Sequence, residues 1–95
     1  MLRAIASPVR LAILVDLKTP AACYPAQIDG DAVTDGICAD FIRERLGIAA
    51  ATASRHLTIL TDAGLLVSTR KKGWTFYSRD EAAILRFAEA LSLLL

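Results

Sequence analysis

The stretch that decides the fold is LGIAAATASRHLTILTDAGLLVSTRKKGWTFY, residues 46–77. Its leucine-glycine start ends one helix, and the amphipathic segment that follows forms a second helix ending at Ala63-Gly64. Two alternating runs, residues 66–71 and 74–79, flank Lys72-Gly73, and this pattern predicts a β-hairpin because Gly73 accepts the positive φ of a tight turn. Two helices followed by a hairpin are the parts of a winged helix-turn-helix.

The second helix has two distinct faces at about 100° of rotation per residue. Its apolar face should pack inward and consists of Ala53, Leu57, Leu60 and Gly64. Its opposite face should point outward and consists of Ala51, Ser54, Arg55, Thr58 and Asp62. This helix is therefore the one expected to enter the major groove of DNA, and we call it the recognition helix.

The outward side chains suit particular contacts to DNA. Arg55 suits a two-pronged contact to guanine O6 and N7, and Ala51 suits a thymine methyl group. Ser54 and Thr58 suit phosphates or mixed base edges, and Thr52, on the flank, suits a backbone phosphate. The sequence thus predicts one main base reader surrounded by weaker contacts.

His56 and the hairpin complete the predicted DNA-binding set. His56 lies about 60° from the apolar centre of the recognition helix, which favours a half-buried packing histidine over a base reader or a ligand. Residues 49–79 carry five basic residues against one aspartate, a charge of +4, whereas residues 19–36 carry three aspartates and no basic residue. We expect phosphate contacts from Arg70, Lys71 and Lys72, although charge at a turn also serves simply to solvate it.

The motifs in this stretch carry a family resemblance. They are Leu46-Gly47, the TASRHL of residues 52–57, the LTDAGL of residues 60–65 and the WTFY of residues 74–77. In these the chain resembles the arsenic-repressor (ArsR) family of bacterial transcription regulators. The resemblance implies a homodimeric repressor that binds a palindromic operator in double-stranded DNA and is released by a small inorganic or redox signal. One departure is Ala49, where the family has a capping serine, a loss of about 1 kcal/mol of cap energy.

The remaining segments are predicted from caps and periodicity. Residues 1–6 form a short first helix, and Ser7-Pro8 opens a second that is buried on most sides and runs to Lys18. Residues 20–36 form a long loop, after which a helix begins at Asp35 or Gly36 and continues to Leu46. In the hairpin, Trp74 and Phe76 share one face and should both be core residues.

The composition indicates one domain that does not hide all its apolar surface. A chain of 95 residues with 55% hydrophobic residues makes a single domain, residues 1–95, and favours a homodimer. Asp80 caps a last helix whose apolar stripe exceeds what one small domain buries; the stripe consists of Ile84, Phe87, Ala88 and Leu91. In the family this helix pairs with its twofold mate. The predicted fold class is therefore mainly α with a small β-hairpin, a winged helix-turn-helix dimerised through terminal helices.

The location of the protein follows from what the chain lacks. No apolar run approaches the roughly 18 residues of a membrane span, so no membrane partner is expected. The opening residues have no apolar core for a signal peptide, and two cysteines without one suggest thiols in a reducing cytoplasm.

The two cysteines leave the signal open. In some family members a C-x-C pair binds metal, and that pair falls on Cys38 and Asp40 here, so only the first thiol is kept. Cys23, in the long loop, could approach Cys38 and give two thiolates for zinc or cadmium, with Asp40 or another loop aspartate as a further ligand. The same two thiols could instead form a dithiol switch. The plain alternative is that neither thiol senses anything.

Other classes of function have less support. Enzymatic activity has almost none, because the chain has no nucleophile elbow, no phosphate-binding loop and a single histidine. The stronger alternatives are a winged helix that binds another protein instead of DNA, and a constitutive repressor with no inducer.

Overall fold

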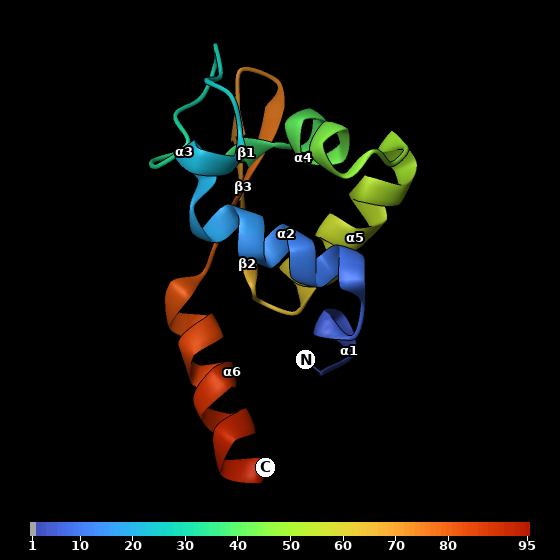
Figure 1. The fold of residues 1–95 in the computed structure, drawn as a ribbon. Coiled ribbons are helices and arrows are strands. Elements are labelled where there is room, and N and C mark those ends of the chain that lie inside the picture. Colours follow the sequence, from blue (N-terminus) through green and yellow to red (C-terminus); the bar gives the residue numbers. More distant parts are fainter. Residues whose placement is uncertain (1) are drawn as a thin grey trace.

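Nine helices and strands follow one another in the computed structural model, which describes residues 2–95 (Figure 1). They are α1 (Leu2–Ile5), α2 (Pro8–Lys18), α3 (Pro20–Cys23), β1 (Ile37–Cys38), α4 (Ala39–Leu46), α5 (Ala50–Asp62), β2 (Leu66–Lys71), β3 (Trp74–Arg79) and α6 (Glu81–Leu94). The strands form one antiparallel sheet in the order β1-β3-β2. The chain is thus mainly helical with a small sheet, a winged helix-turn-helix. The first helix, predicted over residues 1–6, is present as α1. Met1, which the prediction included, lies outside the described residues.

Helix α2 begins as predicted but is less buried than predicted. The Ser7 side chain accepts a hydrogen bond from the Arg10 amide at 3.3 Å, and Pro8 occupies the first turn. Ile13, Leu14 and Leu17 are buried on the inner side. Leu11 and Val15 lie on the outer side, and Val15 is 64% exposed. The prediction that this helix is buried on most sides was therefore wrong. The rest of the chain covers only one face of this helix.

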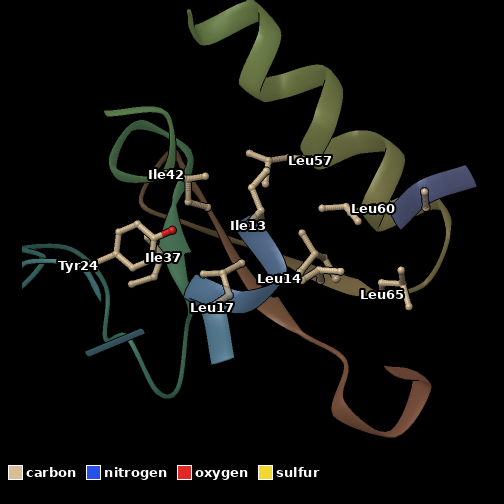
Figure 2. Close-up of a cluster of buried hydrophobic side chains, with 11 residues drawn as sticks. Ile13, Leu14, Leu17, Tyr24, Ile37, Ile42, Leu57, Leu60 and Leu65 are labelled. Atoms are coloured by element: carbon tan, nitrogen blue, oxygen red, sulfur yellow. The ribbon is translucent and has the colours of Figure 1, made fainter. Parts of the chain in front are cut away.

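The core lies between α2, the helix-turn-helix and the sheet (Figure 2). Leu57 and Leu60 of α5 are completely buried in it, and Ala53 is buried as well, which confirms the predicted inner face of the recognition helix. Gly64, assigned to the same face, is exposed because it lies beyond the end of α5. Ile13 from α2 and Ile42 from α4 are likewise inaccessible to solvent. Burial of these side chains fixes α5 against the body and leaves its other face outward.

The long loop is partly helical, which the sequence did not predict. Its first four residues, Pro20–Cys23, form α3, and Tyr24 directly after it is buried in the core (Figure 2). Asp31 then organises a turn, since its Oδ1 accepts the amides of Val33 and Thr34 at 2.9 Å each. These backbone donors, Thr34 first, lower the pKa of the Asp31 carboxyl. We call residues 24–36 the acidic loop.

The prediction that a helix starts at Asp35 or Gly36 was wrong, because residues 37–38 form strand β1 and α4 begins only at Ala39. Strand β1 pairs with β3, with Cys38 opposite Phe76. The Gln27 side chain of the acidic loop holds β1 from its other side, since it donates to the Gly36 carbonyl and accepts from the Cys38 amide, both at 2.8 Å. Partners distant in sequence therefore draw these residues into the sheet.

The hairpin has the predicted turn and register. Its strands pair from Leu66 opposite Arg79 to Lys71 opposite Trp74, and Lys72 and Gly73 connect them with φ values of 52° and 79°. Two positive φ values in succession make the turn that matches the twist of antiparallel strands. We call residues 66–79 the wing.

The two aromatic residues expected in the core differ in their burial. Phe76 is 1% exposed, as predicted, whereas Trp74 is 44% exposed, so its assignment to the core was wrong. Trp74 pairs with Lys71 at the tip of the wing, where the strands extend past the core.

Helix α6 leaves the body of the molecule after the sheet (Figure 1). Asp80 caps it as predicted, since its Oδ1 accepts the Ala83 amide at 3.0 Å. Ala83 is buried and Ile84 is half-buried against the core, but Leu85 and the last three leucines are exposed. No helix within residues 2–95 is long and apolar enough to cross a membrane.

Candidate nucleic-acid interface

The recognition helix presents the side chains that the sequence assigned to DNA. Ala51, Ser54, Arg55 and Thr58 are exposed on the outward face of α5, and Thr52 is half-buried on its flank. No side chain caps the helix at Ala49, in keeping with the missing serine. First-turn amides without a side-chain cap remain available to a phosphate.

Arg55 is the most available cation on this face. Within residues 2–95 its guanidinium forms no ion pair, unlike Arg43, Arg45 and Arg79. A guanidinium that is exposed and not engaged by a carboxylate can approach a guanine edge without first breaking an ion pair. Base reading by Arg55 stays a prediction.

The recognition helix and the wing share a shallow depression. Thr58 lines it from α5 and Ser68 lines it from β2, with Asp62 and Tyr77 beside them. Polar side chains of the helix and the hairpin thus form one continuous surface, and burial raises the pKa of the Tyr77 hydroxyl in its lining.

His56 is half-buried, as the sequence indicated, and it has a partner that the sequence did not reveal. Its Nδ1 lies 3.0 Å from Nη1 of Arg10. Because a guanidinium only donates, Nδ1 accepts and the ring is neutral. Burial, followed by the nearby Arg10 and Arg55 charges, lowers the pKa of His56. Arg10 also donates to the Arg3 carbonyl at 3.1 Å, so this network ties the recognition helix to α1 and α2.

The wing carries the predicted basic residues, but two of them are already engaged. Lys71 Nζ lies 3.0 Å from Asp35 Oδ2, and Lys72 Nζ lies 3.8 Å from Asp29 Oδ1. Both carboxylates belong to the acidic loop, which runs beside the hairpin turn (Figure 1). Arg70 is exposed, and its Nη1 donates to the Thr75 hydroxyl at 3.3 Å.

Sequence reasoning missed that these loop carboxylates lie against the wing. The signal was present, since an acidic segment and a basic turn occur in one small chain, but nothing local indicates that they meet. The hydrogen bond from the Asp31 amide lowers the pKa of Asp35 most, and the hydrogen bond from Lys71 lowers it further. This carboxyl therefore stays ionised beside the wing at neutral pH.

Arg79 does not belong to the basic surface. It was counted in the positive charge of residues 49–79, yet its side chain is only 11% exposed. Its Nη1 donates to the Leu14 carbonyl at 2.9 Å and its Nη2 to Glu81 at 3.0 Å. Arg79 therefore fastens the sheet to α2 and α6 and is unavailable to phosphate.

Comparison with known proteins places this geometry in a class. No protein-family model matches the chain. It is 38% identical over 89 residues to the uncharacterized HTH-type transcriptional regulator YbzH of Bacillus subtilis (strain 168), covering 94% of this chain and 89% of that protein. The chain belongs to the HTH-type transcriptional regulators. It is a DNA-binding regulator of transcription, a class whose members are typically not enzymes.

In this HTH-type regulator the predicted sensor residues lie in different surroundings. Cys38 is buried at the start of α4, and Asp40, two residues on, forms an ion pair with Arg43 at 3.3 Å. Cys23 lies half-buried in α3, with its Sγ 3.8 Å from the Thr19 hydroxyl. Both thiols are free, and residues 2–95 contain no group of three or more potential ligands that could hold a metal ion. Cys38 and Asp40 line a common cavity, whereas Cys23 is not part of its lining.

Proposed function

We propose that this HTH-type regulator is a winged-helix repressor of the ArsR type that binds a palindromic operator in double-stranded DNA as a homodimer. The observation that carries the proposal is the outward face of α5, on which Arg55 is exposed and forms no ion pair within residues 2–95. A packed helix with such a face, followed by a basic hairpin, is the arrangement that reads a major groove.

The individual roles follow from position. Arg55 reads a guanine, Ala51, Ser54 and Thr58 contact neighbouring base edges or phosphates, and Thr52 contacts a phosphate at the flank. His56 supports the helix through Arg10, and its ring edge adds to the same surface.

The wing acts through its charge. Arg70 is available at once, whereas Lys71 and Lys72 reach phosphate by exchanging their contacts with the acidic loop. Such an exchange costs little, because ion pairs between exposed side chains contribute weakly to stability.

Exposed apolar side chains support the dimer. They occur on α1, α2 and α6 and consist of Leu2, Leu11, Val15, Leu85, Leu93 and Leu94. Small monomeric proteins seldom expose so many large apolar residues. A twofold dimer would hide them and present two recognition helices to successive turns of a palindrome.

The signal proposed for release acts at the start of α4, through Cys38. Zinc or cadmium would require Cys23 and Asp40 to join Cys38, and as placed these residues do not form a three-ligand group. A redox change at the thiols, alone or as a Cys23–Cys38 pair, is the other route, and a repressor without an inducer is the third. Release of DNA by oxidant or metal that persists in both Cys23→Ser and Cys38→Ser would exclude the cysteines.

The experiment that tests the function is a binding titration with the duplex directly upstream of the protein's own gene, followed by fluorescence anisotropy. We expect tight, salt-dependent binding that a scrambled duplex does not match. Lys18→Ala removes one exposed charge from the end of α2 and serves as the control for Arg55→Ala, which should weaken operator binding selectively. Equal affinity for both duplexes would contradict sequence-specific binding, and failure to bind either would favour a winged helix that binds protein.

A further inference from the structure

A cavity of about 230 Å³ lies between the acidic loop, α4 and the wing. An engineered apolar cavity of roughly 150 Å³ is enough to bind benzene, so this space accommodates a molecule built on one aromatic ring. The residues that determine its chemistry are the aromatic Phe41, Trp74 and Phe76 and the acidic Asp29, Asp40 and Glu44.

The aromatic side chains form an apolar wall that remains partly open to water. Phe76 is fully packed at the base, and Phe41 contributes from α4. Trp74 stands half-exposed in the wall, and Ile28 of the acidic loop is 100% exposed. Both would lose contact with water if an apolar molecule occupied the cavity, and this burial would favour binding.

The charged residues of the lining are all acidic: it contains three carboxylates and neither lysine nor arginine. Asp40 is paired with Arg43 at 3.3 Å, and Asp29 is only loosely paired with Lys72 at 3.8 Å. Glu44 is exposed and forms no ion pair within residues 2–95. Because Asp40 and Glu44 are four residues apart on α4, they face the same side and repel each other.

We propose that this cavity binds a small organic cation, such as a protonated amine that carries an aromatic ring. The ammonium group would lie between Asp40 and Glu44 and relieve their repulsion, and the ring would pack against Phe41 and Trp74. Trp74 can also attract the cation through its ring face. An anion meets three carboxylates, and a bare metal ion leaves the aromatic wall without a partner, so neither matches the whole lining.

The position of the cavity connects it to the DNA surface. Its walls come from α4 of the helix-turn-helix and from β3 of the wing, and its Asp29 is the partner of Lys72. A ligand held by Asp40 and Glu44 of α4 and by Trp74 of β3 would contact both elements and would link occupancy of the cavity to their spacing. The binding itself needs no DNA and does not depend on the proposed function.

Trp74 provides a direct test because it is the only tryptophan. Purified protein is titrated with phenethylammonium chloride and, separately, with the neutral analogue 2-phenylethanol at the same pH and ionic strength. We expect a saturable change in Trp74 emission for the amine at a concentration about tenfold lower than for the alcohol. A linear, unsaturable change, or no difference between the two compounds, would overturn the proposal.

Two matched variants separate a charge-reading site from simple apolar adsorption. Glu44→Gln removes the unpaired carboxylate and should weaken amine binding about tenfold while leaving the alcohol unchanged. Glu89→Gln makes the same change on the exposed side of α6 and should leave both compounds unchanged. Calorimetry with each variant checks that the fluorescence reports binding. Equal weakening by the two substitutions, or none by Glu44→Gln, would contradict the assignment.

Discussion

Replacing Asp35 by asparagine should strengthen DNA binding, because this carboxylate holds a lysine that a phosphate would otherwise engage. The Lys71 ammonium lies 3.0 Å from Asp35 Oδ2. Asparagine keeps an oxygen that can accept the Asp31 amide, which Asp35 accepts at 2.8 Å, so the loop turn should survive. The substitution thus removes the charge and leaves the local fold.

The size of the effect follows from the exposure of the pair. The Lys71 side chain is 45% exposed and that of Asp35 is 16% exposed, so solvent screens the contact and its contribution is small. We expect operator affinity to rise about two- to fivefold at an ionic strength of about 0.15 M. A lysine newly available to phosphate should also steepen the plot of log K against log salt by up to about 0.9.

Fluorescence anisotropy over a salt series measures both quantities. Glu89→Gln raises the net charge equally but lies on α6, so sedimentation first establishes that it leaves the dimer unchanged, and its binding then reports the effect of overall charge. In a double-mutant cycle, Asp35→Asn should have no benefit once Lys71 is replaced by alanine. Thermal unfolding of each variant establishes that the comparison is between folded proteins.

Two results would refute this reasoning. If Glu89→Gln tightened binding as much as Asp35→Asn, general electrostatics would account for the gain. If Asp35→Asn still tightened binding in the Lys71→Ala background, the ion pair would not compete with DNA.

Four further substitutions test other parts of the structure. Arg55→Ala should weaken operator binding by about 1–3 kcal/mol and relax specificity at one base pair, which competition with singly altered operators measures. Unchanged affinity and specificity would mean that α5 does not enter the major groove as proposed. Sedimentation should show a dimer at micromolar concentration for the wild type and a monomer for Leu91→Glu in α6, and a monomeric wild type would rule out the proposed dimer. Gly36→Ala should destabilise the fold by about 1–3 kcal/mol in urea unfolding, because Gly36 has φ +100° and an added Cβ would meet the Tyr77 carbonyl, and a wild-type midpoint would contradict this. Folding lowers the pKa of His56, so the contribution of His56 to stability is present above the unfolded pKa of about 6.5 and is lost as the pH falls through the folded pKa. In urea unfolding, the wild type should therefore lose its stability advantage over His56→Gln between pH 7.5 and pH 5. A stability difference that does not vary with pH would exclude this role.

Local chemistry alone determined the helix-turn-helix and the wing. The inner face of α5 follows from a period of 3.6 residues, and its members Leu57 and Leu60 are buried as that period requires. The caps at Ser7 and Asp80 and the turn at Gly73 depend on one or two neighbouring residues, so the sequence contains all the information they need. The exposure of Arg55 on the opposite face of the same helix follows in the same way.

The tertiary structure decided which distant residues contact the helix-turn-helix and the wing. Lys71 and Asp35 are 36 positions apart, and Arg79 reaches the Leu14 carbonyl across 65 positions. No periodicity records such pairs, because they form only where packing brings separate segments together. Strand β1 arises in this way, through β3 and the distant Gln27, and Trp74 is exposed because the hairpin is longer than the core is wide. Side-chain direction is thus set by neighbouring residues, whereas the partner that each side chain meets is set by the packing of the whole chain.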